Sequence, residues 1–296
     1  MRNLNAYLFA TSPRDAVRLL HTTAGRGCYL AGATDLMLER RADLDFVVDL
    51  RRAGLDDVVV QDDGALRIGA CVTLNRLESD PLVREFAGGA VADAAAACGN
   101  RPVRSTATLG GNICSALPSA DMVPVLLALD AVAHAFDGES THDIPLDEFF
   151  TGPRRTVLDG RLLTGLTLPA PQPGLVCLSR KLRRTAEDIS LVQAAVAVAR
   201  GGNGLGYVGI ALGAVAPTPM RALAAEDILL RADPEEFEIA VAAAAESAAD
   251  ASDPIDDHRA SAEYRRAMVE VLTRRLLREA LGIDPTAEDP VHGGLR

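Results

Sequence analysis

The glycine pair Gly110-Gly111 constrains the fold of this chain more than any other feature. Neighbouring glycines cost backbone entropy, so a folded chain keeps them where no Cβ fits or where φ must be positive. The pair lies in a polar loop within residues 107–121, which runs into an apolar helix expected over residues 123–129. Two interpretations stay open from this loop alone: a close approach by a ligand, or a tight turn without one. The preceding Arg101 and Arg104 are either phosphate ligands or solvated side chains.

Length, composition and charge exclude several classes of function. The 296 residues suggest roughly two domains, and 30 basic against 41 acidic side chains give a net charge of −11. Because a phosphate backbone repels a negative protein, nucleic acid is not expected as a partner. No stretch approaches the roughly 20 apolar residues of a membrane span. The apolar run within residues 1–10 is too short for the core of a signal peptide.

The cysteines indicate a reducing compartment. They are odd in number and widely scattered, and they form neither a C-x-x-C motif nor a cluster with histidines. This pattern predicts free thiols, a cytoplasmic protein and no protein-bound metal. Redox chemistry would then need an organic cofactor or a partner subunit. The residues concerned are Cys28, Cys71, Cys98, Cys114 and Cys177.

A second glycine-containing turn lies near the N-terminus. Residues 28–31 predict a buried strand that ends in Gly32-Ala33-Thr34-Asp35, and residues 36–41 continue with helical character. A strand that breaks at glycine into a helix leaves several N–H groups unpaired at one point, which is a geometry that receives phosphate. The same residues are also typical of an ordinary capped helix, and both interpretations stay open.

The remaining pattern predicts two domains. Residues 169–174, Pro-Ala-Pro-Gln-Pro-Gly, form the clearest boundary. Before it we expect a domain over residues 1–170, with subdomains of about 1–53 and 54–170. After it we expect a C-terminal domain over 175–283 and a mobile tail over 284–296. The elements predicted in the C-terminal domain are strands over 176–182, 189–199 and 207–216, a hairpin turn over 201–206, and helices over 221–231, 234–249 and 260–281. The last helix is expected to pack one face, including Tyr264, Met268 and Leu276, against the strands.

Two motifs in a fixed order resemble those of a known family. The sequences Ala31-Gly32-Ala33-Thr34-Asp35 and Thr108-Leu109-Gly110-Gly111-Asn112 are similar to its two flavin loops, approximately A-G-G-x-[ST] and T-[IL]-G-G-N. The family is that of the FAD-binding medium subunits of molybdenum hydroxylases, which includes carbon monoxide dehydrogenase and xanthine dehydrogenase. The resemblance spans essentially the whole chain. It extends to Pro118 with Asp121, Phe149 to Gly152, Arg180-Lys181-Leu182 with Asp188-Ile189-Ser190, and Ser261 to Arg266.

This resemblance implies an α+β fold. The expected architecture is a two-subdomain FAD-binding fold of the vanillyl-alcohol-oxidase (PCMH) type. A C-terminal domain of three β-strands and three helices is expected to follow it.

The resemblance also implies which residues bind FAD. Asp121 would anchor a sugar hydroxyl or order the loop, although its position before an apolar helix is also typical of an N-cap. Lys181 would lie near the flavin, where a cation stabilises the reduced, anionic ring; the alternative is a solvated lysine on a strand. Ala33 departs from the pattern because the family commonly has a second glycine there, which puts FAD affinity in question. The backbone N–H groups expected to surround the pyrophosphate are those of Ala31, Gly32, Ala33, Thr34, Asp35 and the adjoining Leu36, and of Thr108, Leu109, Gly110, Gly111 and Asn112.

The implied function is that of an FAD-carrying electron-transfer subunit of a molybdenum hydroxylase. It would relay electrons from [2Fe–2S] clusters on a small subunit, fed by a molybdopterin cofactor on a large subunit, to NAD⁺, oxygen or a quinone. A dimer of heterotrimers is the expected assembly, and no catalytic residue is assigned to this chain. Two alternatives remain: a stand-alone flavoprotein oxidase or dehydrogenase of the same fold, and a non-catalytic assembly subunit with a weakened flavin site. The second is suggested by Ala33, which stands where the family commonly has glycine.

Overall fold

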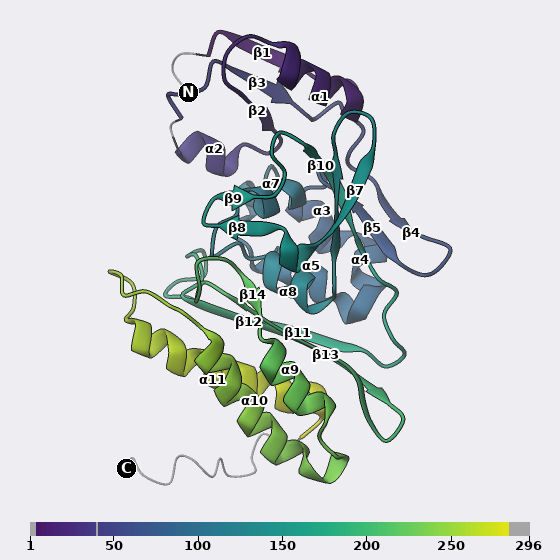
Figure 1. The fold of residues 1–296 in the computed structure, drawn as a ribbon, viewed down its shortest axis with the longest axis vertical. Coiled ribbons are helices and arrows are strands. Elements are labelled where there is room, and N and C mark those ends of the chain that lie inside the picture. Colours follow the sequence, from purple (N-terminus) through teal and green to yellow (C-terminus); the bar gives the residue numbers. More distant parts are fainter. Residues whose placement is uncertain (1–3, 40, 284–296) are drawn as a thin grey trace.

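The structure is a computed structural model that describes residues 4–39 and 41–283. The expected tail, residues 284–296, lies outside the described residues. Figure 1 shows three sheets stacked along the long axis of the molecule: a three-stranded sheet at the N-terminal end, a five-stranded sheet in the middle, and a four-stranded sheet covered by the last helices. The mixture of helices and separate sheets agrees with the predicted α+β class. The predicted division at residue 170 stays a prediction.

The first sheet is parallel and has the order β1-β3-β2. Its central strand is buried along its whole length, as a strand covered on both faces must be. The first helix, α1, begins with a side-chain cap, since the Ser12 side chain accepts the N–H of Asp15 and Pro13 lies in the first turn. The elements are β1 (Ala6–Phe9), α1 (Pro13–Thr22), β2 (Gly27–Leu30), α2 (Thr34–Leu38) and β3 (Phe46–Asp49).

The middle sheet is antiparallel and has the order β4-β5-β10-β6-β7. Its strands are β4 (Val58–Val60), β5 (Leu66–Gly69), β6 (Val132–Phe136), β7 (Thr141–Pro145) and β10 (Leu162–Leu168). A separate short hairpin joins β8 (Phe150–Gly152) to β9 (Arg155–Thr156). The helices packed here are α3 (Leu74–Ser79), α4 (Pro81–Glu85), α5 (Ala90–Ala97), α6 (Arg101–Arg104), α7 (Leu109–Cys114) and α8 (Val123–Ala128), with short 3-10 turns at Phe86–Gly89 and Leu146–Glu148.

The C-terminal sheet contains the three predicted strands and a short fourth strand that was not predicted. The order is β11-β12-β13-β14, all antiparallel, and the predicted hairpin turn joins β12 to β13. The elements are β11 (Val176–Leu182), β12 (Val192–Gly201), β13 (Gly204–Gly213), β14 (Met220–Arg221), α9 (Leu223–Leu230), a 3-10 turn at Pro234–Glu236, α10 (Phe237–Ala251) and α11 (Ala262–Leu281). The helices α9 to α11 cover one face of this sheet (Figure 1).

The other face of this sheet packs against α8 at very short range. Ala195 and Ala197 of β12 belong to the core around α8, whereas the valines that alternate with them face α9 to α11. A Cβ on Gly209 would lie 2.3 Å from the carbonyl oxygen of Ala128, and one on Gly213 would lie 2.8 Å from the ring of Pro124. Small residues at these positions therefore allow the helix backbone to rest on the sheet.

The predicted buried face of α11 is partly wrong. Leu276 is buried and Met268 is half-buried, but the Tyr264 side chain is 45% exposed. The neighbouring Arg265 takes the buried place, because its guanidinium finds acceptors inside the protein. Among the residues that the structure describes, no helix is both long and apolar enough to cross a membrane.

Candidate functional site

The first glycine loop, residues 31–36, connects β2 to α2 and presents unpaired N–H groups. Ala33 has φ 60° and ψ 4°, the left-handed conformation, and the helix that follows has no side-chain cap. Within residues 4–39 and 41–283, no acceptor takes the N–H of Gly32, Ala33, Thr34, Asp35 or Leu36. A left-handed residue followed by helical residues points successive N–H groups into one concavity, which is an arrangement that binds anions. The loop is only half-buried, so these groups are accessible.

Gly32 holds this loop against a segment that is distant in the sequence. A Cβ at position 32 would lie 1.9 Å from the carbonyl oxygen of Thr106 and 2.9 Å from the Cα of Ala107. Only glycine permits that backbone-to-backbone contact. Residues 106 and 107 lead directly into the second glycine segment, residues 108–112, so the two predicted flavin motifs lie side by side.

The second glycine segment is the start of helix α7 rather than a loop. Thr108 is its N-cap and accepts the Gly111 N–H at 3.1 Å. The N–H groups of Leu109 and Gly110 donate to the carbonyls of Val72 and Ala70, at 2.9 and 2.8 Å, and that of Asn112 donates to Thr108 O. The expectation that this segment offers free N–H groups to a pyrophosphate is therefore wrong for residues 109–112. Each of these donors already has a partner in the protein.

The two glycines of the pair serve different purposes. A Cβ on Gly110 would lie 2.7 Å from the Cβ of Ala70, which directly follows β5. Packing against Ala70 therefore leaves no room for a side chain at position 110. Gly111 is exposed, and a Cβ there would meet only the Thr108 hydroxyl, at 3.0 Å. The side chain of Asn112 accepts the Met122 N–H at 3.2 Å. Gly111 and Asn112 therefore form the surface that this segment presents.

Asp121 is not the N-cap of α8, so the interpretation of this residue as a helix cap is wrong. The N-cap position belongs to Met122, and no side chain caps the helix. The Asp121 carboxylate accepts Lys181 Nζ and Ser190 Oγ, both at 2.8 Å, and its carbonyl accepts Gln193 Nε2 at 2.8 Å. Asp121 is 7% exposed, and a buried carboxylate requires such partners. These contacts support the interpretation that Asp121 orders the loop.

Lys181 is the single lysine of the chain, and it is not solvated. Its side chain on β11 is 4% exposed and forms an ion pair with Asp121. The thiol of Cys98 lies beside this pair, and burial, with the Asp121 carboxylate adding to it, raises the pKa of Cys98 to about 12. Burial also raises the pKa of Asp35 in the first glycine loop, against the opposing charge of Arg154. Elements of both halves of the chain thus converge on one buried polar cluster.

Arg154 is a site residue that the sequence did not single out. It occupies the turn between β8 and β9, where its N–H donates to Ala116 O at 2.8 Å just after α7. Its guanidinium forms an ion pair with Glu39, just after α2. One residue therefore bridges the ends of both glycine-containing segments. The only sequence signal for Arg154 is its position two residues after the Phe-Phe-x-Gly block, and this signal is weak.

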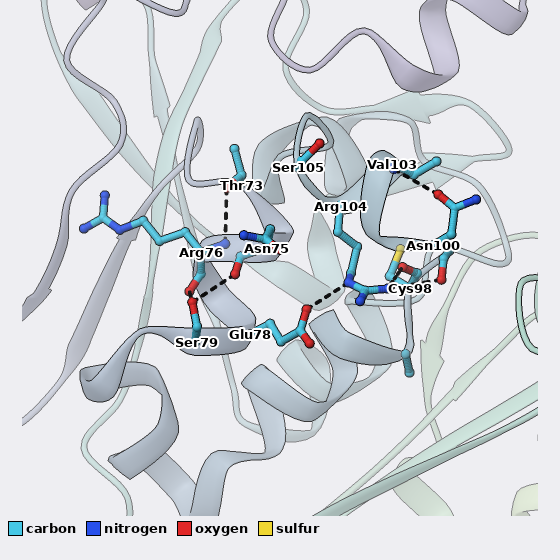
Figure 2. Close-up of polar contacts among 12 residues, drawn as sticks. Thr73, Asn75, Arg76, Glu78, Ser79, Cys98, Asn100, Val103, Arg104 and Ser105 are labelled. Carbon is cyan, nitrogen blue, oxygen red and sulfur yellow. Dashed lines mark hydrogen bonds and ion pairs between the residues drawn. The ribbon is translucent and has the colours of Figure 1, made fainter.

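Arg104 is a structural residue rather than a phosphate ligand. Figure 2 shows its guanidinium turned towards Glu78 of α3, with Nε 2.9 Å from the carboxylate. The same group donates to the carbonyls of Cys98 and Gly99, at 3.4 and 3.2 Å. The side chain of Asn100 caps α6 by accepting the Val103 N–H. These contacts fix the turn that delivers residues 106 and 107 to Gly32.

Comparison with known proteins identifies the family. Residues 2–171 match the family described as the FAD binding domain in molybdopterin dehydrogenase, and residues 179–280 match the CO dehydrogenase flavoprotein C-terminal domain. The chain belongs to the FAD-binding subunits of the molybdenum hydroxylase family. Its cofactor is FAD, and it is an oxidoreductase component.

Individual relatives match over nearly their full length. The carbon monoxide dehydrogenase medium chain of Afipia carboxidovorans is 31% identical over 274 residues, which cover 90% of this chain and 93% of the relative. The xanthine dehydrogenase FAD-binding subunit of Escherichia coli O157:H7 is 29% identical over 289 residues, covering 95% and 97%. A solved structure of carbon monoxide dehydrogenase from Hydrogenophaga pseudoflava superposes with a TM-score of 0.88 at 29% identity, covering 95% of this chain and 98% of that one. The predicted family and fold class are thereby confirmed.

The first glycine loop of this FAD-binding subunit fits the anionic part of its cofactor. The unpaired N–H groups and the glycine cradle at position 32 are the features that a pyrophosphate requires. Ala33 keeps the left-handed conformation in spite of its methyl group. The concern that alanine excludes a positive φ is therefore corrected: the conformation is retained at a cost of about 1–2 kcal/mol.

Proposed function

We propose that this subunit carries FAD as an electron relay, receiving electrons from [2Fe–2S] clusters of a partner and passing them to NAD⁺, oxygen or a quinone. The observation that carries the proposal is the pairing of an accessible N–H concavity with a buried, fully paired polar cluster at Asp121 and Lys181. Such a site positions a cofactor and sets its electrostatic surroundings, while the redox chemistry belongs to the cofactor. Bound FAD would supply that chemistry by taking up and releasing electrons.

Different residues would bind different parts of FAD. The N–H groups of residues 32–36, with Ala31 at the start of the loop, would bind the pyrophosphate, supported by their lack of other acceptors among the described residues. Gly111 and Asn112 would contact the cofactor through their exposed surface. Thr108, Leu109 and Gly110 would shape that surface by fixing α7 on the β5 end.

Asp121 and Lys181 would complete the site. Asp121 would order the chain between α7 and α8 while facing a sugar hydroxyl of the cofactor. Lys181 would place the only ammonium group of a side chain near the flavin, where its attraction for electron density is balanced by the carboxylate that it contacts. Their mutual ion pair supports a role in electrostatic tuning rather than in proton transfer.

The names of the relatives support a heteromeric assembly. Two of them are medium chains of carbon monoxide dehydrogenase, and one is a subunit of a 6-hydroxypseudooxynicotine dehydrogenase complex. We therefore propose a large molybdopterin subunit and a small [2Fe–2S] subunit as partners, in a dimer of heterotrimers. A cytoplasmic location is proposed as well, supported by five free thiols.

Reconstitution tests the proposal. The full chain is incubated with FAD, separated from free cofactor, and measured for flavin absorbance and for co-purification with its neighbouring gene products. We expect about one FAD per chain, no oxidation of small organic substrates by the chain alone, and flavin reduction only in the complex. Turnover by the isolated chain would instead favour a stand-alone oxidase or dehydrogenase. Failure to retain FAD at any concentration would favour an assembly subunit with a decayed site.

A further inference from the structure

Arg265 of α11 is a buried arginine that holds two main-chain segments at one end of the C-terminal sheet. Its side chain is 6% exposed, and its Nη1 donates to Leu191 O at 2.8 Å and to Ala214 O at 3.2 Å. Leu191 directly precedes β12 and Ala214 directly follows β13, and these strands are paired at Gln193 and Gly213. Because a buried guanidinium must be paired, Arg265 ties the two strand ends together.

The charge of Arg265 is balanced by Asp257, which lies in the segment that leads into α11. Arg265 Nη2 donates to Asp257 Oδ1 at 2.8 Å. Burial alone would raise the pKa of Asp257, but hydrogen bonds from the N–H groups of Arg259 and Ala260, together with Arg265, lower it instead. The carboxylate therefore stays ionised and keeps the guanidinium in one orientation.

The two segments held by Arg265 are the ones that hold the chain around Asp121. Ser190 and Gln193, on either side of Leu191, donate to the Asp121 carboxylate and carbonyl, each at 2.8 Å. Ala214 donates its N–H to Pro118 O at 2.7 Å. Ala214 has φ 64°, an unfavourable conformation for alanine that persists where its surroundings hold it on both sides.

The series of contacts continues to helix α7. The Met122 N–H, next to Asp121, donates to the Asn112 side chain at 3.2 Å. A continuous path thus joins Arg265 to Asn112. Each step is either a polar contact or the bond to the next residue of the chain. The path connects the last helix of the chain to the second glycine segment.

We propose that Arg265 is a positioning residue for the flavin site, acting through Leu191 and Ala214 on Asp121 and α7. This inference rests on the proposed placement of FAD beside Asp121 and Asn112. It assigns a task to the Ser261 to Arg266 block, which lies far from both glycine segments in the sequence. Without Arg265, the strand ends relax, and the arrangement that binds FAD is populated in only a fraction of the molecules.

Arg221 provides a matched control at the opposite end of α8. Its side chain, also in the C-terminal domain, is 14% exposed; it donates to Glu226 at 2.8 and 2.9 Å and forms an ion pair with Asp130 of the FAD-binding domain. Asp130 follows α8, whereas Asp121 precedes it. Loss of Arg221 therefore weakens the same domain contact without touching the path to α7.

The experiment compares Arg265→Lys and Arg265→Met with Arg221→Lys in the full chain. FAD dissociation constants are measured by quenching of flavin fluorescence, the visible circular dichroism of bound FAD reports its surroundings, and thermal unfolding reports stability. We expect both Arg265 variants to raise the dissociation constant by about tenfold, since the apparent affinity falls with the fraction of competent molecules. Arg265→Lys should lie between wild type and Arg265→Met. Arg221→Lys should lower the melting temperature but change the dissociation constant less than twofold and leave the flavin spectrum unaltered.

Two further variants separate the possible failures. Ser190→Ala removes one link of the path without altering α11, and it should raise the dissociation constant in the same direction even if Arg265→Met does not fold. Asp121→Asn tests the placement of FAD itself. If Asp121→Asn weakens FAD but neither the Arg265 variants nor Ser190→Ala do so beyond the Arg221 control, the positioning role is overturned and the placement stands. If Asp121→Asn has no effect, the placement fails and the inference falls with it.

Discussion

The ammonium of Lys181 donates to the carboxylate of Asp121 at 2.8 Å, and both side chains are almost fully buried. Lys181 lies on the first strand of the C-terminal domain, and Asp121 lies just before α8 of the FAD-binding domain. The only lysine of the chain therefore joins the two domains, next to the residue whose N–H donates to Asn112. Arginine supplies every other basic side chain apart from the histidines.

Loss of the lysine should be more costly than loss of the pair. In Lys181→Met the Asp121 carboxylate is left buried without its counter-ion, and breaking a buried pair costs about 3–5 kcal/mol. The double variant Lys181→Met with Asp121→Asn removes both charges and should recover more than half of that loss. Denaturant unfolding of the single and double variants measures both values. A single variant as stable as wild type would show that the pair contributes nothing.

Glycine at position 33 should strengthen the first loop. Ala33→Gly removes the left-handed strain of about 1–2 kcal/mol, and the greater freedom of glycine in the unfolded chain returns roughly half of it. The net gain is about 0.5–1 kcal/mol, and FAD should bind several-fold more tightly because the N–H groups are better ordered. Ala87→Gly is the control, since Ala87 also has a positive φ, of 47°, but lies outside the flavin loops. It should gain similar stability while the FAD dissociation constant stays the same.

Arg154 should matter more for FAD binding than for stability. Its partner Glu39 is also partly exposed, and an exposed pair contributes only about 0–1 kcal/mol to folding. Arg154→Ala nevertheless frees α2 from the chain after α7, so FAD affinity should fall several-fold with little change in melting temperature. Arg155→Ala, one residue along the same turn, is the control. Titrations at low and high salt should show the difference between wild type and Arg154→Ala shrinking as the ion pair is screened.

Buried thiols should lower the free energy of unfolding in alkaline solution. Burial raises the pKa of Cys177 from about 9 to about 12, so the unfolded thiol ionises first as the pH rises. The stabilising effect is complete below about pH 9 and is lost between pH 9 and 12, at up to about 1.4 kcal/mol per pH unit for each such group. Cys177→Ala should therefore show a shallower decline in melting temperature between pH 9 and 10.5. A slope equal to that of wild type would contradict this assignment.

Local sequence patterns were sufficient where the structure depends on neighbouring residues. The turn between β12 and β13 follows from its glycine-rich turn chemistry, and the strand before Gly32 follows from its short apolar run. The sequence also predicts the strand-to-helix break at Gly32, but not the close backbone contact that Gly32 makes. The partner in that contact, Thr106, could not be read from the sequence because it lies 74 positions away.

The polar residues of the site were harder to place because their partners are distant in the sequence. Asp121 has the sequence position of a helix cap, yet Lys181, Ser190 and Gln193 supply better partners from another domain. Helical periodicity placed Tyr264 in the core instead of Arg265, since periodicity does not register that a guanidinium can find buried carbonyls. For the glycine pair, the sequence indicated tight geometry but not that a helix begins at Leu109.

The close contact of Gly209 and Gly213 with α8 has a mechanical consequence. With less than a methyl group of space between backbone and sheet, the C-terminal domain cannot slide or tilt on this helix without collision. These two glycines therefore hold the sheet at a fixed distance from α8. Helix α2 is held differently, since none of its residues is buried. It exposes Met37 and Leu38 to solvent, and the Glu39 to Arg154 ion pair ties its end to the β8–β9 turn. The restraint on α2 is thus a surface ion pair, whereas the restraint at α8 is a contact between backbones.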